Sequence, residues 1–329
     1  MKRPIAQLSA TGRGIPDRVM TNHDFAAIGI ETTHEWIIER TGISERRIAG
    51  EGETTCSMAA TAARQAMERA GVQAGELDIV MLTTATPDRL LPATAVDLQA
   101  ELGAKRAAAF DLSAACAGFV YALTVAEGLI AAGSAETILV CGSEKMSAIV
   151  DWTDRSTCVL FGDGAGAAVV QRSRQGRGIL GSFIRSDGQL ADLLYRPAGG
   201  ASIPFSQQVL TDRTFLVKMA GRETFKHAVR SMSEAADRAL DAARVTSADV
   251  DLMIPHQANL RIIEATAKHA GIPMDKVYVN VDRYGNTSSA SVAIALDEAI
   301  ERGVVGEGST VMLVAFGAGF TWASSVIRL

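Results

Sequence analysis

The sequence predicts an α/β fold made of two repeated halves, and three observations lead to that prediction. Short apolar runs typical of buried strands alternate with longer segments whose apolar residues recur at helical spacing. At 329 residues, with 48% hydrophobic and 21% charged residues, the chain can bury a large core in two domains or one α/β unit. The second half also matches the pattern of the first when shifted by 173 positions, from 78 to 251.

The repeat aligns two strands and the helix that lies between them. Asp78 to Met81 falls on Asp251 to Ile254, and Thr137 to Val140 falls on Thr310 to Leu313. Chance similarity between two apolar α/β segments is the alternative, but one shift holds without a gap across all of these strands. The repeat therefore predicts two halves of the same architecture.

The boundary between the halves is expected in the polar stretch 171–178. We divide the chain into an N-terminal half, residues 1–175, and a C-terminal half, residues 176–329. A pseudo-twofold relation between them would place Cys116 near the start of the matching helix in the second half.

Several elements of the first half begin or end at residues with known turn or capping chemistry. Residues 9–18 are punctuated by Gly and Pro and predict a turn after a first strand. The segment Thr32-Thr33-His34-Glu35 has the spacing of a capping box and predicts a helix that Gly42 ends. Thr54 is expected to cap a long helix that runs to Ala70.

A continuous apolar run and a glycine-rich segment complete this half. Asp78 to Leu82 is expected to form a strand buried on both faces. The segment Phe161-Gly162-Asp163-Gly164-Ala165-Gly166-Ala167 is followed by a strand-like run and not by a helix. It therefore lacks the context of a dinucleotide site and is interpreted as a tight turn near the active site.

Composition and charge exclude several classes of function. A net charge of −5 provides no global basic field to hold nucleic acid or an anionic membrane. The four cysteines, at 56, 116, 141 and 158, have no paired spacing and no histidine cluster, which suits a reducing compartment and predicts no metal site. The apolar run at the N-terminus is too short for a signal peptide, and the chain is expected to be cytoplasmic.

Cys116 is the candidate nucleophile. It is set among small residues in Ala114-Ala115-Cys116-Ala117-Gly118-Phe119, between an apolar run and the helical run 120–123. Small neighbours allow other backbone to approach the sulfur, and a helix start favours the thiolate. The alternative for an isolated cysteine in apolar surroundings is a buried structural thiol.

His256 and Asn286 are the candidate partners of this cysteine. The strand Asp251 to Ile254 leads directly into His256, and ligand groups favour the carboxyl ends of strands in open α/β sheets. Asn286 lies in a turn that leads into a helix. Each has a structural alternative, a hydrogen-bonded histidine at a strand end and a helix cap. Their joint appearance with Cys116 favours catalysis.

Six segments together resemble β-ketoacyl-acyl carrier protein synthase III along nearly the whole chain. The resemblance implies a thiolase-like fold, a five-layer αβαβα sandwich of two βαβαβαββ halves that usually forms a homodimer. The segments that carry it are Glu35-Trp36-Ile37 with Arg40-Thr41-Gly42-Ile43, Cys116-Ala117-Gly118-Phe119, Phe161 to Ala167, His256-Gln257-Ala258-Asn259, Gly285-Asn286-Thr287-Ser288 and Phe316-Gly317-Ala318-Gly319-Phe320.

The resemblance implies an acyltransferase with no metal and no cofactor, for which acyl-CoA is a substrate. Cys116 would attack the acyl-CoA thioester, and the backbone N–H groups of Cys116 and Ala318 would stabilise the oxyanion. His256 and Asn286 would hold the enolate oxygen that forms when malonyl-acyl carrier protein loses CO₂. The product would be a 3-oxoacyl-acyl carrier protein that initiates fatty acid synthesis.

Single residues distinguish the expected activity from those of related enzymes. A thiolase carries a second cysteine in the loop 315–319, which has none here, and chain-elongating synthases have histidine at the position of Asn286. A condensing enzyme of a specialised, polyketide-type pathway is the alternative function that these residues leave open. The order Cys116, His256, Asn286 would also suit a papain-like hydrolase, although that family's cysteine signature is absent.

The resemblance also assigns residues to the CoA site. Trp36 and Arg155 would sandwich the adenine, and Arg40 would meet the phosphates. Phe225 and Asn259 would line the pantetheine tunnel. Two departures from the family pattern are Arg222, which stands where a smaller polar residue is common, and Ala318, which replaces a glycine whose backbone alone is used.

Two further surfaces are assigned to partners. Acyl carrier proteins are acidic, so Arg261 and Lys268, seven residues apart on one predicted helix, and Lys226 are expected to form a basic docking patch. The resemblance implies that Leu91, on a loop crossing the dimer interface, closes the acyl pocket of the neighbouring subunit. Its intermediate size predicts short to medium, including branched, acyl primers.

Overall fold

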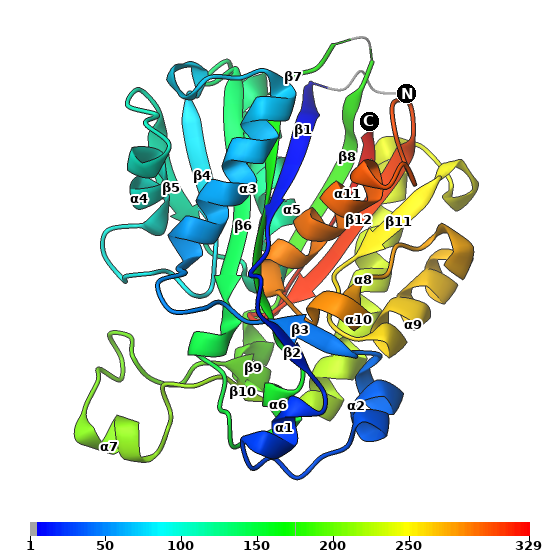
Figure 1. The fold of residues 1–329 in the computed structure, drawn as a ribbon. Helices are drawn as coiled ribbons and strands as arrows, with labels where there is room; N and C mark the ends of the chain where they lie inside the picture. The colour runs from blue at the N-terminus through cyan, green and yellow to red at the C-terminus, as the bar shows by residue number, and fades with distance from the viewer. Residues whose placement is uncertain (1–4, 175) are drawn as a thin grey trace.

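The computed structural model describes residues 5–174 and 176–329. Two β-sheets form the centre of the molecule (Figure 1). The first has the order β1-β7-β6-β4-β5, with β4 parallel to β5 and β6 and the remaining pairs antiparallel. Its strands are β1 (Ala6–Gly14), β4 (Ile79–Thr83), β5 (Ala108–Leu112), β6 (Thr137–Lys145) and β7 (Asp163–Arg172).

The second sheet has the order β11-β12-β13-β8. Here β11 pairs parallel with β12, whereas β13 is antiparallel to both β12 and β8. Its strands are β8 (Gly178–Ser186), β11 (Leu252–Pro255), β12 (Thr310–Gly317) and β13 (Thr321–Arg328). In sequence, the last strand of the first sheet ends at Arg172 and the first strand of the second sheet begins at Gly178. Residue 175, between them, and residues 1–4 of the N-terminal run lie outside the described residues.

Helices cover the outer face of each sheet and also lie between the two sheets, so that the order of layers is αβαβα (Figure 1). In β4, Val80 and Leu82 pack in the core on the outer face of the first sheet, and Ile79 and Met81 pack in the core between the two sheets. This confirms the prediction of a strand buried on both faces. The outer face of the first sheet is covered by α3 (Thr55–Ala70) and α4 (Thr94–Glu101). Between the two sheets lie α5 (Gly118–Ala131) and α11 (Ser291–Glu301). The outer face of the second sheet is covered by α8 (Gly221–Ala243) and α9 (Leu260–Ala270).

Short elements gather at one end of the sandwich (Figure 1). They carry segments that contribute to the candidate site. They are β2 (Val19–Thr21), α1 (Asp24–Ala27), α2 (His34–Thr41), β3 (Glu45–Arg47), α6 (Arg155–Cys158), β9 (Leu194–Tyr195), α7 (Gln207–Thr211), β10 (Lys218–Met219) and α10 (Val281–Tyr284). Within the described ranges, none of the helices is long and apolar enough to cross a membrane.

Matching positions of the repeat make the same contacts. The Asp78 carboxylate accepts a hydrogen bond from the Thr137 N–H at 3.0 Å, and the Asp251 carboxylate accepts one from the Thr310 N–H at 2.8 Å. In each pair the backbone N–H of the aspartate also donates to the carbonyl of the threonine at 2.9 Å. Each aspartate therefore ties the start of one parallel strand to the start of its neighbour.

Two sequence-based expectations about turns are wrong. The first strand does not turn at residue 9 but continues to Gly14 as part of β1. Its glycines serve close packing, because a Cβ on Gly12 would lie 2.3 Å from the Ala62 carbonyl oxygen of α3. Likewise, Gly164 and Gly166 lie inside β7 and not in a tight turn.

The capping predictions are nearly correct. Thr54 and Ser57 form a reciprocal capping box, and α3 ends at Gly71 in the left-handed conformation. Helix α2 ends at Gly42 as expected, but its N-cap is Thr33, whose hydroxyl accepts from the Trp36 N–H, and not Thr32.

Candidate active site

Cys116 lies in the short 3₁₀ turn Ala115–Ala117, immediately before α5. Two glycines create the space around it. A Cβ on Gly317 would lie 2.5 Å from the Cys116 backbone nitrogen, and a Cβ on Gly118 would lie 2.9 Å from the Thr83 Cβ. Both positions therefore require glycine, and the resulting close packing buries Cys116.

The sulfur of Cys116 lies 3.4 Å from the hydroxyl oxygen of Ser288. Two residues at this contact have positive φ angles that non-glycine residues rarely adopt, 45° at Ala115 and 49° at Ser288. The Ser288 N–H donates to the Asn286 side-chain oxygen at 2.9 Å, which helps to hold the strained turn in place.

Asn286 is positioned by the segment that precedes β7. Its N–H donates to the Leu160 carbonyl at 2.8 Å, and its carbonyl accepts from the Gly162 N–H at 3.1 Å. A Cβ on Gly162 would lie 2.2 Å from the Tyr284 carbonyl oxygen. Because Ser288 occupies the side-chain oxygen of Asn286, the amide nitrogen is left as the donor toward a ligand.

His256 follows β11 and is almost completely buried. Its backbone N–H donates to the Val314 carbonyl at 2.7 Å, and its ring Nδ1 lies 2.6 Å from the Ser291 hydroxyl oxygen. Burial lowers the pKa of His256 to about 3. The imidazole is therefore neutral at physiological pH.

The structure brings the three candidate catalytic residues together. Cys116, His256 and Asn286 line one narrow cavity of about 120 Å³, together with Phe225 and Asn259. Most other lining groups are apolar, so few polar atoms compete with those of the three residues. The cavity is thus a mainly apolar channel lined by a thiol, a neutral imidazole and an amide.

A second cavity, of about 250 Å³, also reaches Cys116. Ser288 and Ala318 line it beside the sulfur, and an apolar wall of Met146, Ile149, Phe161, Leu194 and Val217 extends from them. The sequence analysis missed this wall, since scattered apolar residues carry no local signal of a pocket. Leu91 lies on neither cavity of its own chain and is 85% exposed.

The protonation state of Cys116 differs from the expectation that a helix start favours the thiolate. Burial raises the pKa of Cys116 to about 12, and the hydrogen bond with Ser288 only partly opposes this effect. Removal from water therefore outweighs the local donors, and the resting sulfur carries a proton.

Trp36, Arg40 and Arg155 form one stack. The guanidinium carbons of Arg40 and Arg155 lie 4.5 and 4.6 Å from the centre of a Trp36 ring. Arg155 also donates to the Glu31 carbonyl at 2.7 Å. The three residues assigned to the adenine and phosphates of CoA thus lie together, but Arg155 rests on Trp36 without space for a base between them.

Asn259 and Phe225 also line the first cavity. The Asn259 side-chain oxygen accepts from the Arg261 N–H at 2.9 Å as the N-cap of α9, and its amide nitrogen donates to the Arg40 carbonyl at 2.8 Å. Asn259 therefore ties α9 to α2 at the cavity, while Arg222, in the first turn of α8, is exposed.

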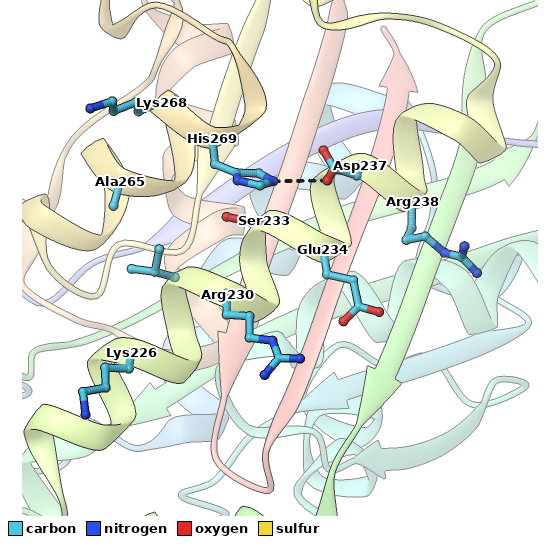
Figure 2. A pocket seen from close by; sticks show the side chains of 10 residues that line it. Lys226, Arg230, Ser233, Glu234, Asp237, Arg238, Ala265, Lys268 and His269 are labelled. Atoms are coloured by element: carbon cyan, nitrogen blue, oxygen red, sulfur yellow. Dashed lines mark hydrogen bonds and ion pairs between the residues drawn. The ribbon is translucent and has the colours of Figure 1, made fainter.

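The expected basic patch has mixed charge. Arg261 and Lys268 are exposed on α9, but Lys226 forms an ion pair of 2.9 Å with Glu223. The groove between α8 and α9 also contains acidic side chains, and His269 contacts Asp237 at 3.1 Å (Figure 2). Its lining includes the side chains of Lys226, Arg230, Glu234, Asp237, Arg238, Lys268 and His269.

Comparison with known proteins gives a consistent result. Residues 110–188 match the family model "3-Oxoacyl-[acyl-carrier-protein (ACP)] synthase III", and residues 240–329 match the model of its C-terminal region. A "Beta-ketoacyl-[acyl-carrier-protein] synthase III" of Roseiflexus sp. (strain RS-1) is 50% identical over 98% of both chains.

Solved structures agree with these matches. The 3-oxoacyl-[acyl-carrier-protein] synthase III of Aquifex aeolicus VF5 superposes with a TM-score of 0.91 at 47% identity, covering 98% of this chain and 100% of that one. The priming β-ketosynthase from the R1128 polyketide biosynthetic pathway has the same TM-score at 38% identity, covering 99% and 97%. The αβαβα sandwich is therefore the predicted thiolase-like fold.

Proposed function

The chain belongs to the 3-oxoacyl-[acyl-carrier-protein] synthase III family, and we propose on this basis that it condenses acyl-CoA with malonyl-acyl carrier protein, with loss of CO₂, to initiate fatty acid synthesis. The observation that carries the proposal is the meeting of Cys116, His256 and Asn286 in one apolar cavity. A papain-like hydrolase is set aside, because the match to the synthases covers the whole chain.

In the first half-reaction, the sulfur of Cys116 attacks the thioester carbonyl and loses its proton, and CoA leaves as a thiolate that takes up a proton to become the free thiol. The acyl group is then held as a new thioester, and exchange of one thioester for another needs no external energy. The backbone N–H groups of Cys116 and Ala318 are the proposed oxyanion donors. Their placement on one cavity, with Gly317 packed against the Cys116 backbone, supports this role.

In the second half-reaction, the malonyl thioester loses CO₂ and its carbonyl oxygen takes up enolate charge. The amide nitrogen of Asn286 and the ring Nε2–H of a neutral His256 donate hydrogen bonds to this oxygen. The enolate carbon attacks the acyl-enzyme carbonyl, and the sulfur of Cys116 leaves. All steps use groups of the chain and its two substrates, so the proposal requires no metal or cofactor.

Substrate recognition is proposed at the mouth of the first cavity. CoA binds with its adenine on Trp36, which requires Arg155 to move from that ring, and with Arg40 at its phosphates. Phe225 and Asn259 line the path of pantetheine, since both lie on the cavity that leads to Cys116.

The remaining partners follow from surface chemistry. Acyl carrier protein is proposed to dock at Arg261 and Lys268 on α9, with Lys226 contributing less because Glu223 already pairs with it. A homodimer is proposed, in which Leu91 reaches the partner subunit. A cytoplasmic site of action remains a prediction, supported by four free thiols.

The two half-reactions can be tested separately. Cys116→Ala should abolish the mass increase that acyl-CoA produces on the parent protein, whereas Cys56→Ala, a control on α3, should keep it. His256→Ala and Asn286→Ala should each slow malonyl decarboxylation about a hundredfold, since one oxyanion donor contributes about 3 kcal/mol, yet still form the acyl-enzyme. Equal loss of both half-reactions in these two variants would contradict the assigned roles.

Similarity to a priming ketosynthase of a polyketide pathway supports a second candidate, the same chemistry on a specialised carrier protein. Competition between a fatty-acid and a polyketide carrier protein, both loaded with malonyl groups, separates the two candidates. Preference for the fatty-acid carrier is expected.

A further inference from the structure

The side chain of Gln257 is almost completely buried, and the reaction described above does not use it. It nevertheless makes four hydrogen bonds, the full capacity of an amide with two N–H donors and two lone pairs on its oxygen. The amide nitrogen donates to the Pro255 carbonyl at 2.8 Å and to the Tyr278 carbonyl at 3.1 Å. The amide oxygen accepts from the backbone N–H groups of Asn280 and Val281 at 2.9 and 3.0 Å.

These four bonds join two segments of the chain. Pro255 is the last residue of β11, and His256 follows it directly. The other three partners lie in residues 278–281, which lead into α10. Gln257 therefore fastens the start of α10 to the strand end that carries His256.

The same short helix leads to Asn286. Helix α10 begins at Val281, and the N–H of Gly285 donates to the Val281 carbonyl at 2.9 Å. Gly285 has a φ of 63°, and a Cβ there would lie 2.9 Å from the Leu160 carbonyl oxygen. Asn286 is the next residue. Because this turn is short and closely packed, a shift of Val281 would also move Asn286.

Helix α10 is also held by Glu298 of α11. The side-chain nitrogen of Asn280 and a guanidinium nitrogen of Arg283 both donate to the same carboxylate oxygen of Glu298, each at 2.9 Å. These contacts fix the turn to α11. The contacts with Gln257 fix it to β11, and so relate its position to that of His256.

The proposed reaction depends on that relation. His256 and Asn286 come from different segments, yet both must donate to one enolate oxygen. Donors of this kind act when they lie about 2.7–3.1 Å from the oxygen on which charge develops. A misplacement of about 1 Å can slow a reaction about a hundredfold. The separation of the two donors must therefore be held constant.

We propose that Gln257 is a positioning residue that fixes the spacing between His256 and Asn286. The inference rests on the proposed function. Gln257 touches neither substrate nor the reacting atoms. It acts through its bonds to the strand end on one side and to the start of α10 on the other. Cys116 lies on a separate turn, so acylation of its sulfur does not depend on this spacing.

The test measures two rates in Gln257→Met and Gln257→Asn. Met keeps the length of the side chain but loses the hydrogen bonds, and Asn is one methylene too short to reach both segments. Acylation by acyl-CoA is followed by mass, and CO₂ release from malonyl-acyl carrier protein is followed directly. Both rates are expressed per Cys116 that acyl-CoA can acylate, so that a loss of folded protein lowers neither.

Decarboxylation should fall about a hundredfold in Gln257→Met, whereas acylation should stay within about threefold of the parent. Gln257→Asn should show the same selective loss. The loss should appear in kcat with KM for malonyl-acyl carrier protein unchanged, since the two donors act on charge that develops in the transition state.

Two comparisons separate positioning from general destabilisation. Gln99→Met removes another amide hydrogen bond, to the Ala104 carbonyl at 2.7 Å on α4, and should leave the ratio of the two rates unchanged. In a His256→Ala background, Gln257→Met should slow decarboxylation less than about threefold further. A substrate oxygen with a single remaining donor can follow that donor, so the spacing no longer matters.

Each outcome decides the matter. A parent-like ratio of decarboxylation to acylation in either folded variant overturns the proposal, as does an equal loss of both rates or a raised KM with unchanged kcat. A hundredfold further loss in the His256→Ala background shows that the effect is independent of the spacing. If neither variant contains sites that can be acylated, Gln257 serves folding and the proposal is withdrawn. A parent protein that acyl-CoA never acylates contradicts the proposed function itself.

Discussion

The ring Nδ1 of His256 lies 2.6 Å from the hydroxyl oxygen of Ser291, the first residue of α11. With the hydroxyl as donor, this contact makes Nδ1 the acceptor and leaves the proton on Nε2. This is the tautomer that the proposed role of His256 at the enolate oxygen requires, and a residue on a different element would then select it. A histidine in the other tautomer would present a lone pair to that oxygen.

The first prediction follows from this contact. Ser291→Ala should slow malonyl decarboxylation about tenfold, because a hydrogen bond of this kind contributes about 1–1.5 kcal/mol, while acyl-enzyme formation changes little. Both rates are measured on the same preparation. As a control, Ser182→Ala removes another hydroxyl pair, with Ser325, and should leave both rates unchanged. A decarboxylation rate equal to that of the parent would show that Ser291 does not orient the ring.

The buried neutral histidine also predicts how stability depends on pH. The pKa of His256 falls from 6.5 in the unfolded chain to about 3 in the folded protein, because of burial. Between these values the unfolded state binds the extra proton, so the folded state loses stability as the pH drops below about 6.5. The loss is at most about 1.4 kcal/mol per pH unit for one group.

Comparison with a variant isolates this effect. The pKa values of Glu144 and Asp163 are raised by burial, so these groups contribute with the opposite sign in both proteins. Denaturant unfolding of the parent and of His256→Gln between pH 5 and 7 should therefore give a smaller decrease toward low pH in the variant. Identical slopes would mean that His256 is protonated in the folded protein.

The third prediction concerns the loop behind the sulfur. Gly317→Ala would place a Cβ 2.5 Å from the Cys116 nitrogen, so the turn that carries the sulfur must shift. We expect at least a hundredfold loss of acylation, since small misplacements of reacting groups have effects of this size. Ala318→Gly is the matched control, because only backbone is needed there, and it should stay within about threefold of the parent. Normal acylation in Gly317→Ala would contradict the required close approach.

The sequence could predict the features of the fold that are repeated along the chain or marked by a local pattern of residues. The shift that aligned Asp78 with Asp251 corresponds to equal contacts in the structure, and the burial of β4 on both faces followed from an uninterrupted apolar run. The family resemblance rested on ordered motifs, and the relatives confirm it. These features are local in the sequence or repeated along it.

What the sequence could not predict depends on contacts between distant segments. Gly12 looked like a turn residue, whereas its lack of a side chain lets α3 pack on β1. Ser288 and Ser291 stand in an ordinary serine-rich run, and only the fold shows that one faces Cys116 and the other His256. The sequence predicts Lys226 in a basic docking patch, but in the structure Lys226 forms an ion pair with Glu223, three residues earlier on the same helix.

The last prediction concerns two leucines that the single chain leaves uncovered. Leu90 and Leu91 are 77% and 85% exposed on the loop between β4 and α4, the highest values among the large apolar residues described. Neighbouring exposed apolar side chains of this size are typical of an interaction surface. We propose that the cavity lined by Met146, Ile149 and Val217 is the acyl pocket, and that in the proposed homodimer Leu91 closes this pocket of the partner subunit.

Substitution at Leu91 should therefore change the choice of primer. Leu91→Phe should narrow the range toward acetyl-CoA, and Leu91→Ala should admit longer chains, because an apolar pocket discriminates by about 1–3 kcal/mol per methylene group. The rate of Cys116 acylation with a series of acyl-CoAs gives the readout. Val304→Ala, at an exposed apolar residue after α11, should leave the preference unchanged. If both Leu91 variants keep the parent's preference, Leu91 does not end the pocket and the proposed dimer geometry must be withdrawn.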